Sequence, residues 1–151
     1  MVDIFSREKR SHVMAQIRGR DTKPELLLRR SLWAIGFRYS LHRKGLPGRP
    51  DLVLTKWNAV IFVHGCFWHA HENCAGFRLP KSRVEFWQEK LDGNRTRDEQ
   101  SALALVEGGW SVAVVWECAI EADVEKVSEI LSKWLRATKR VNILEVRSST
   151  S

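Results

Sequence analysis

The segment that most constrains the fold is Ala59-Val60-Ile61-Phe62-Val63, an unbroken apolar run rich in β-branched side chains. A short run of this kind, bounded by turn residues, is typical of a strand that is buried on both faces. Trp57-Asn58 marks a turn before it, and Asp51-Leu52-Val53-Leu54 is a second strand candidate, so the two are expected to form a hairpin. The apolar run from Trp110 to Trp116, preceded by Gly108-Gly109, predicts a further buried strand.

Helical patterns surround these strands. Thr22 and Glu25 have the spacing of a capping box and Pro24 suits a first turn, so a helix is expected from there to about Ile35, ended by Gly36. Its apolar face would consist of Leu26, Leu27, Leu32 and Trp33. Other helices are expected over about residues 6–17, over 82–107 with a break at Gly93, and over 123–135, together with a short strand over 37–41.

This order of elements predicts a single α/β domain over residues 1–151, with a small mixed central sheet flanked by helices. The basic segment of about residues 1–20 would form an arm or helix that grips a polyanionic partner. Residues 137–151 or so would form a partly frayed tail.

Charge and hydropathy limit the possible partners. The chain carries 25 Lys and Arg against 18 Asp and Glu, a net charge of +7. Such a balance favours a polyanionic partner, because each neutralised phosphate releases counterions, although a merely soluble basic protein is left open. The N-terminal residues lack the apolar core of a signal peptide, and no apolar run reaches membrane-spanning length. The protein is therefore expected in the cytoplasm.

Three cysteines and one histidine have the spacing of a metal site. Cys66, His71 and Cys74 form a local Cys-x4-His-x2-Cys segment, and Cys118 follows the later strand. Three cysteines and a histidine are a standard ligand set for structural zinc, in which the protein fills all four tetrahedral positions. The alternative is three buried free cysteines that pack as small apolar side chains, which suits Cys118 better than Cys74 in its polar loop.

A second group of residues has the chemistry of a hydrolase. Asp51 opens one strand, His64 follows the end of the next, and His69 lies in the turn beyond. A carboxylate suits Mg²⁺, and a neutral histidine suits the role of general base for a water nucleophile, so the group could hydrolyse a phosphodiester. Pro50-Asp51 alone is a weak signal of a restriction-endonuclease-like nuclease, because Phe62-Val63-His64 stands where that class has a carboxylate-x-Lys pair.

A wider set of motifs resembles the very-short-patch repair (Vsr) endonucleases over about residues 10–135. The residues that carry the resemblance are Gly48-Arg49-Pro50-Asp51, the segment from Val60 to His69, Glu85-Phe86-Trp87, Gly109-Trp110 and Val115-Trp116-Glu117-Cys118. The resemblance implies a variant restriction-endonuclease-like fold. It also implies an enzyme that nicks DNA beside a T:G mismatch, left when 5-methylcytosine deaminates, with Mg²⁺ as its catalytic and Zn²⁺ as its structural ion.

The same resemblance implies roles for individual residues. Asp51 and the backbone carbonyl of Val63 would bind Mg²⁺. His69 would activate the attacking water, and His64 would assist at the metal and the phosphate. Glu25 would contribute through metal-bound water, although it could equally be a helix-capping residue. The family usually has threonine at the position of Val63, so either the carbonyl is what binds metal or a hydroxyl is missing here.

Aromatic and polar residues are expected to contact DNA. Phe67-Trp68 lies in a polar loop, and by the resemblance these two residues and Trp87 would intercalate beside the mismatch. By the same resemblance Lys90 and Asn94 would approach the mismatched pair, unless they only form a solvated helix face, and Met14 would belong to the N-terminal arm. Core packing is the alternative for Trp87 and the expectation for Trp33, Trp110, Trp116 and Trp134.

We therefore expect a Mg²⁺-dependent nickase of very-short-patch repair that acts as a monomer on double-stranded DNA with a T:G mismatch. Functional links to a cytosine-5 DNA methyltransferase and to mismatch repair proteins would follow. One alternative is a related nickase of broader or different specificity. Another is a zinc-stabilised DNA-binding protein that does not cut, against which Asp51, His64 and His69 together argue.

Overall fold

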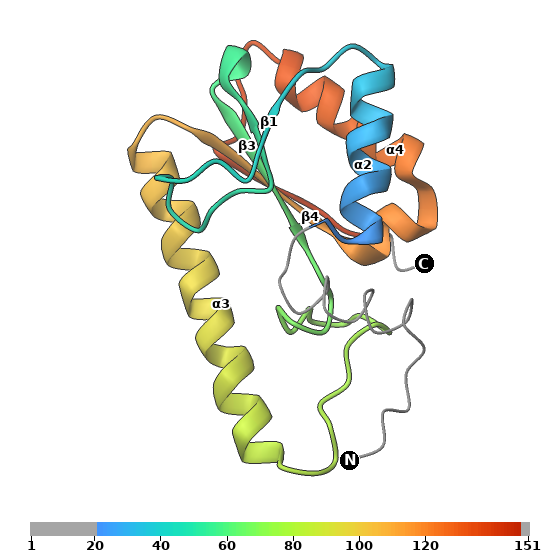
Figure 1. Ribbon diagram of the computed structural model, residues 1–151, viewed down its shortest axis with the longest axis vertical. Coiled ribbons are helices and arrows are strands. Elements are labelled where there is room, and N and C mark those ends of the chain that lie inside the picture. Colours follow the sequence, from blue (N-terminus) through green and yellow to red (C-terminus); the bar gives the residue numbers. More distant parts are fainter. Residues whose placement is uncertain (1–20, 149–151) are drawn as a thin grey trace.

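In the computed structural model, which describes residues 21–148, five strands form one mixed sheet in the order β1-β2-β3-β4-β5 (Figure 1). The strands are β1 Ser40–Leu41, β2 Leu52–Leu54, β3 Ala59–His64, β4 Ser111–Trp116 and β5 Ile143–Val146. The first three are antiparallel neighbours, whereas β4 pairs parallel with β3, and β5 pairs parallel with β4. The mixed sheet and the hairpin of β2 and β3 confirm the sequence-based expectation; the predicted helix around Met14 lies outside the described residues.

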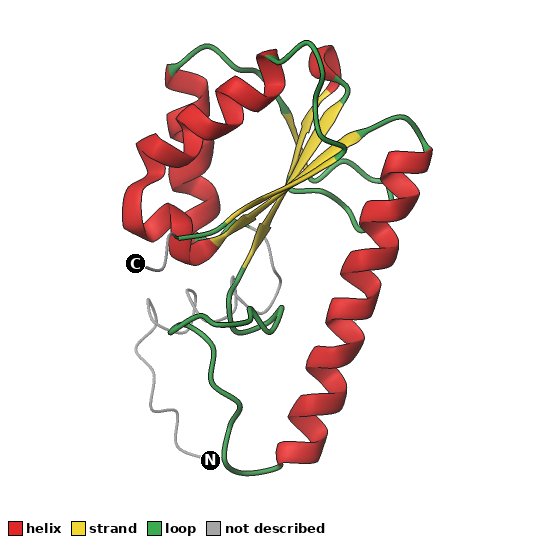
Figure 2. Cartoon of the chain, turned by 180° about the vertical axis from the view of Figure 1, so that it is seen from behind, coloured by secondary structure: helices red, strands yellow, loops and turns green. Residues whose placement is uncertain are grey.

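Helices cover both faces of this sheet (Figure 2). Helices α2 (Lys23–Ala34) and α4 (Glu117–Arg136) lie on one face, and α3 (Val84–Glu107) lies on the other. Strand alternation divides the core in the same way, because Ala59 and Ile61 of β3 pack with the α2 and α4 side, whereas Val60 and Phe62 pack with α3. At the carboxyl end of β3, odd-numbered residues therefore point toward α2 and α4, and even-numbered residues point toward α3.

Helix α2 begins as predicted, but its buried stripe differs. Thr22 is the N-cap, its hydroxyl accepts a hydrogen bond from the Glu25 amide at 3.4 Å, and Gly36 follows the last turn with a φ of 102°. The expected apolar face is wrong in part, because Trp33 is 52% exposed and the helix buries Pro24, Glu25, Leu28 and Leu32. The Trp33 ring lies under the Arg38 guanidinium instead of in the core.

Helix α3 is continuous over 24 residues, so the predicted break at Gly93 is absent. Its C-terminal half packs on the sheet through Ala102 and Leu105, and its N-terminal half extends past the sheet edge toward the loop after β3 (Figures 1 and 2). Within residues 21–148 no helix is long and apolar enough to cross a membrane.

The C-terminal region departs most from expectation. Helix α4 starts at Glu117, earlier than the predicted Asp123, which is the kink inside it with non-helical φ and ψ angles. The Asp123 carboxylate accepts a hydrogen bond from the Lys126 amide at 3.1 Å, so the predicted start is the cap of the second segment. The expectation of a frayed tail is wrong for Ile143–Val146, which form β5 and pair with β4.

Candidate active site and metal cluster

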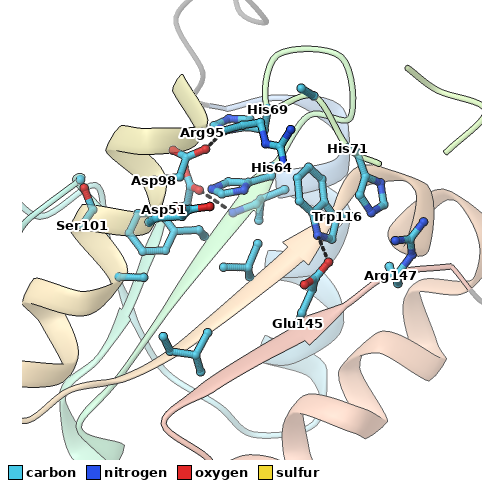
Figure 3. Close-up of a pocket in the computed structure, with 18 of the residues that line it drawn as sticks. Asp51, His64, His69, His71, Arg95, Asp98, Ser101, Trp116, Glu145 and Arg147 are labelled. Carbon is cyan, nitrogen blue, oxygen red and sulfur yellow. Dashed lines mark hydrogen bonds and ion pairs between the residues drawn. The ribbon is translucent and has the colours of Figure 1, made fainter. Parts of the chain in front are cut away.

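A cavity of about 750 Å³ opens at the carboxyl ends of the central strands, on the face of the sheet that α3 covers. Asp51, His64 and His69 all line it, together with Asp98 from α3 (Figure 3). The cavity therefore brings together three of the four residues for which the sequence predicts catalytic roles. The fourth, Glu25, lies in an adjoining polar network.

Asp51 enters this cavity because it directly precedes β2 and its neighbour Val53 packs on the α3 side. One carboxylate oxygen accepts a hydrogen bond from the Val63 amide at 2.7 Å, and the residue is only 6% exposed. Burial raises the pKa of Asp51 to about 7, against the lowering effect of the Val63 hydrogen bond and of the Arg29 charge. A carboxylate in such a place gains stability from a cation, so Asp51 fits the role of metal ligand.

Gly48 allows the loop before Asp51 to approach α3. Its φ is +73°, and a Cβ at this position would lie 2.7 Å from the Cβ of Ser101. Both the left-handed backbone and the close contact require glycine here. The glycine of the Gly48-Arg49-Pro50-Asp51 motif thus has a packing reason of its own.

His64 and His69 form a stacked pair at the end of β3, with ring centroids 3.8 Å apart and planes 1° from parallel. Burial lowers the pKa of His64 well below its usual range, and the charges of His69 and His71 act in the same direction. Among the described residues, the buried Nδ1 of His64 has no hydrogen-bond partner. His64 is therefore neutral at neutral pH, and its ring supports that of His69.

Asp98 is a site residue that the sequence reasoning missed. Its carboxylate lies 2.5 Å from Nδ1 of His69, and both side chains are partly exposed to the cavity. Asp98 follows Asn94 by four residues, so a helix places both on the face that meets the loop after β3. That spacing is the only signal by which it could have been found.

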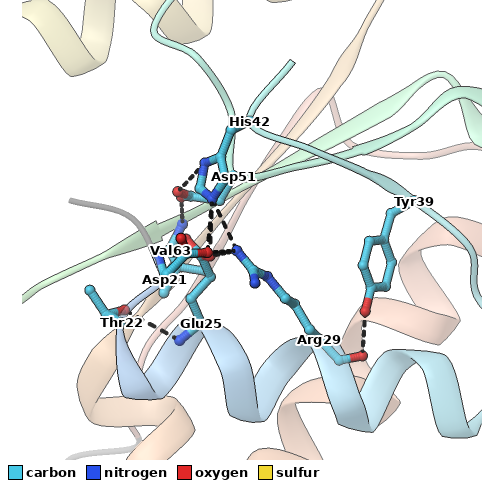
Figure 4. A network of polar contacts seen from close by, with 8 residues as sticks. All are labelled: Asp21, Thr22, Glu25, Arg29, Tyr39, His42, Asp51 and Val63. Carbon is cyan, nitrogen blue, oxygen red and sulfur yellow. Dashed lines mark hydrogen bonds and ion pairs between the residues drawn. The ribbon is translucent and has the colours of Figure 1, made fainter. Parts of the chain in front are cut away.

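Glu25 lies in a buried polar network beside Asp51 (Figure 4). It is 1% exposed, its carboxylate is bound by the Arg29 guanidinium, and it lies 3.2 Å from Nε2 of His42. The carboxylate also accepts a hydrogen bond from the Asp21 amide at 3.1 Å. Glu25 thus belongs to the helix start, where its amide donates to the Thr22 hydroxyl, and its contribution through metal-bound water stays a prediction.

The predicted metal ligands come together as a single cluster. The candidate ligand atoms of Cys66, His71, Cys74 and Cys118 all lie within 4.8 Å of one another. Nδ1 of His71 is 3.6 Å from the Cys118 sulfur, and the Gly76 amide donates to the Cys74 sulfur at 3.4 Å. Burial raises the pKa of the Cys66 thiol, so ionised sulfur in this place requires a cation. Three thiols and one imidazole in this arrangement fit a tetrahedral metal ion.

Tight turns after β3 bring residues of one loop to both the cavity and the metal cluster. The His69 amide donates to the Gly65 carbonyl at 3.2 Å, and the His71 amide donates to the Cys66 carbonyl at 2.9 Å. Ala70, between them, has a φ of 49°, which reverses the chain direction locally. Cys66 and His71 belong to the metal cluster, and His71 lines the cavity together with His69.

The three aromatic residues predicted to contact DNA pack against one another. Phe67 and Trp68 have ring centroids 5.1 Å apart, and Phe67 and Trp87 have centroids 5.5 Å apart, so the N-terminal turns of α3 meet the loop. All three rings are half-buried. Asn94 donates a hydrogen bond to the Trp68 carbonyl at 2.9 Å, and Lys90 is exposed on the same helix.

Known proteins are similar to this chain over most of its length. Residues 2–75 match the family described as DNA mismatch endonuclease Vsr. Type II nicking enzyme V.XorIIP of Xanthomonas oryzae is 48% identical over 120 residues, which cover 80% of this chain and 88% of that protein. Type II nicking enzyme V.NmeAIP of Neisseria meningitidis is 46% identical over 121 residues, 80% of this chain and 86% of its own. DNA mismatch endonuclease Vsr of Escherichia coli is 40% identical over 139 residues, 89% of this chain and 88% of its own.

Proposed function

Since the chain belongs to the Vsr family of DNA mismatch endonucleases, we propose that it nicks one strand of duplex DNA beside a T:G mismatch. Its relatives support the coarser statement directly: it is a DNA nicking endonuclease of mismatch repair. The T:G preference, the catalytic ion and the residue roles are the parts that we add. We also propose a restriction-endonuclease-like fold, which the mixed sheet with helices on both faces supports.

The observation that carries the proposal is the convergence of Asp51, His64 and His69 on one cavity. Asp51 and the Val63 carbonyl would hold a divalent cation, for which Mg²⁺ is the best match to oxygen ligands. When bound, such an ion stabilises the charge that develops on the phosphate and its leaving oxygen. The Val63 amide keeps the Asp51 carboxylate in one orientation for that purpose.

His69 would act as the general base. Because Asp98 engages Nδ1, Nε2 is the atom that would take a proton from the attacking water. The stacked His64 ring is neutral, so His69 can become protonated without facing a second positive charge. Asp98 would then stabilise the positive ring, as a carboxylate does in other histidine-carboxylate pairs.

The cluster of Cys66, His71, Cys74 and Cys118 would hold Zn²⁺ in a structural role, because its four side chains would leave no position of a tetrahedral ion open. The aromatic group of Phe67, Trp68 and Trp87 would enter the DNA beside the mismatch, where unstacking costs least. Lys90, Asn94 and the segment that contains Met14 would add contacts to the duplex. The predictions of a monomer and of links to a methyltransferase and to repair proteins stay predictions.

A nicking assay tests the proposal. Supercoiled plasmid and labelled duplexes, one matched and one with a T:G mismatch, would be incubated with Mg²⁺, with EDTA, or with neither. We expect Mg²⁺-dependent nicking of the mismatched strand only, and a loss of at least about 1,000-fold in Asp51→Asn. Glu125→Gln, an exposed acid on α4, is the matched control and should cut normally.

Two results would overturn parts of the proposal. Nicking by Asp51→Asn at the parent rate would remove the catalytic role of Asp51. Equal cutting of matched and mismatched duplexes would favour a nickase of different specificity, a reading that the type II nicking enzymes among the relatives support.

A further inference from the structure

Two acidic side chains of the proposed site are buried next to each other, and one histidine lies between them (Figure 4). Glu25 comes from α2 and is 1% exposed, and Asp51 precedes β2 and is 6% exposed. His42 is 3.2 Å from Glu25 through Nε2 and 3.8 Å from Asp51 through Nδ1. No sequence motif singles out His42.

The backbone fixes this position of His42. Its amide donates a hydrogen bond to the Asp51 carbonyl at 3.2 Å, directly after the last residue of β1, and its φ is 45°. A left-handed backbone at a residue other than glycine is costly and persists only where the surroundings enforce it. The turn therefore directs the imidazole toward the two carboxylates.

Arg29 supplies positive charge to the same group. Its guanidinium binds the Glu25 carboxylate one turn earlier on α2, the Asp21 carboxylate at 2.7 Å, and Nε2 of His42 at 3.0 Å. Tyr39 donates a hydrogen bond to the Arg29 carbonyl at 2.8 Å, which ties this turn of α2 to the segment before β1. Arg29 is 11% exposed, so little water weakens these contacts.

Asp21, Glu25 and His42 are also close enough together to bind a cation. The Arg29 guanidinium, however, contacts all three of these residues and so stands in the place of an ion. Of the carboxylates of Asp21, Glu25 and Asp51 in this group, that of Asp51 is the one that lines the cavity. The arrangement thus directs cation binding to Asp51.

We propose that Arg29 and His42 are positioning residues for the nicking reaction. Together they hold the Glu25 carboxylate beside Asp51, and they keep a metal ion away from Glu25. This inference rests on the proposed function. Neither residue needs to touch DNA. Arg29 acts through Glu25, and His42 acts as a spacer between Glu25 and Asp51.

Arg29→Met gives two measurements that should move in opposite directions. Loss of a positive charge strengthens the attraction of the group for a divalent cation, so Mn²⁺ should bind about fivefold more tightly in calorimetry. Because Glu25 is no longer held, the single-turnover nicking rate should nevertheless fall at least about tenfold. A protein that had merely lost its fold would bind Mn²⁺ less tightly and nick more slowly.

Matched variants separate charge from geometry. Arg29→Lys keeps the charge but not the planar fork, so it should bind Mn²⁺ like the parent and nick at an intermediate rate. Arg30→Met removes an exposed arginine from the next position of α2 and should change neither quantity by more than about twofold. If Arg29→Met does not fold, the double variant Glu25→Gln with Arg29→Met removes both charges, and it should nick no more slowly than Glu25→Gln alone.

His42 has its own comparison. His42→Gln retains a polar group near Nε2 and should nick within about threefold of the parent, whereas His42→Leu should lose at least about tenfold. Parent-like nicking by Arg29→Met or by His42→Leu would overturn the inference, as would weaker Mn²⁺ binding by Arg29→Met. A parent protein that binds Mn²⁺ but nicks no duplex would instead overturn the proposed function.

Discussion

The indole of Trp116 lies flat against the imidazole of His71, with ring centroids 3.8 Å apart and planes 4° from parallel. The same indole meets the His64 ring edge-on at 5.2 Å, so one side chain touches both the candidate metal cluster and the stacked pair of His64 and His69. Its Nε1 donates a hydrogen bond to Glu145 of β5 at 2.9 Å, which fixes the ring in its plane (Figure 3). The last strand, β5, thereby orients the contact between the two sites.

This contact predicts a joint effect of Trp116→Leu on metal retention and on catalysis. Without the stacked ring, His71 and His64 both lose support, and small displacements of catalytic groups cost much of the rate. We expect nicking to fall at least about tenfold and release of the metal to a chromogenic chelator to accelerate. Trp116→Phe keeps the stack and should show a smaller change in both.

Trp110→Leu is the control for Trp116→Leu. Trp110 directly precedes β4 and packs against the hydrophobic core between α3 and the sheet, at the end of the strands away from the metal ligands. Its loss should therefore lower Tm without faster metal release. If both substitutions released the metal at the same rate, general destabilisation would explain the effect.

The metal cluster predicts a second result. Cys118→Ser removes the one ligand that comes from outside the loop after β3, so the purified protein should contain clearly less than one zinc per chain. A loss of about 3 kcal/mol of stability would lower Tm by roughly 6–12 °C in a chain of this size. Ala122→Ser introduces the same side chain at an exposed position of α4 and should leave both values unchanged.

Local pattern was sufficient for most of the fold. The unbroken apolar run of β3, the Thr22 cap of α2 and the turn at Asn58 are all determined by residues next to one another, and all three are present. Strand β5 was missed because Ile143 and Glu145 remain exposed and the strand exists only through its parallel pairing with β4. No local sequence pattern encodes that distant partner.

The candidate site divides in the same way. A metal cluster is indicated by the residue types and spacing of Cys66, His71 and Cys74. The fold then brings the distant Cys118 to them. Asp98 and Arg29, by contrast, look like ordinary charged positions on helices, where most such residues face water. Only tertiary packing places the first at His69 and the second at Glu25.

Val63 provides a third prediction, which concerns a missing hydroxyl. The Val63 side chain packs on the core cluster between the sheet and the α2 and α4 layer, whereas its amide holds Asp51 at the cavity. Val63→Thr would therefore place its hydroxyl away from the chemistry. We expect nicking within about twofold of the parent and a stability loss of about 1 kcal/mol, measured by denaturant unfolding. A rate increase of tenfold or more would instead show that the hydroxyl contributes to catalysis.

Asp98→Asn tests the pairing with His69. The Asp98 carboxylate accepts a hydrogen bond from Nδ1–H of His69, which leaves Nε2 of His69 as the basic atom. An amide can donate to Nδ1 instead and so favour the tautomer that carries its proton on Nε2, which cannot accept one from water. Single-turnover nicking should fall about 10-fold to 100-fold, less than the roughly 100-fold to 10,000-fold loss expected for His69→Ala.

The control for this pairing is Asp92→Asn, an exposed position two turns earlier on α3, which should nick normally. Because Asp98 acts through His69, the double variant Asp98→Asn with His69→Ala should be no slower than His69→Ala alone. Additive losses in the double variant would mean that Asp98 has a separate role, such as direct contact with the metal or the phosphate. Thermal unfolding of each variant at the assay temperature confirms that the compared proteins are folded.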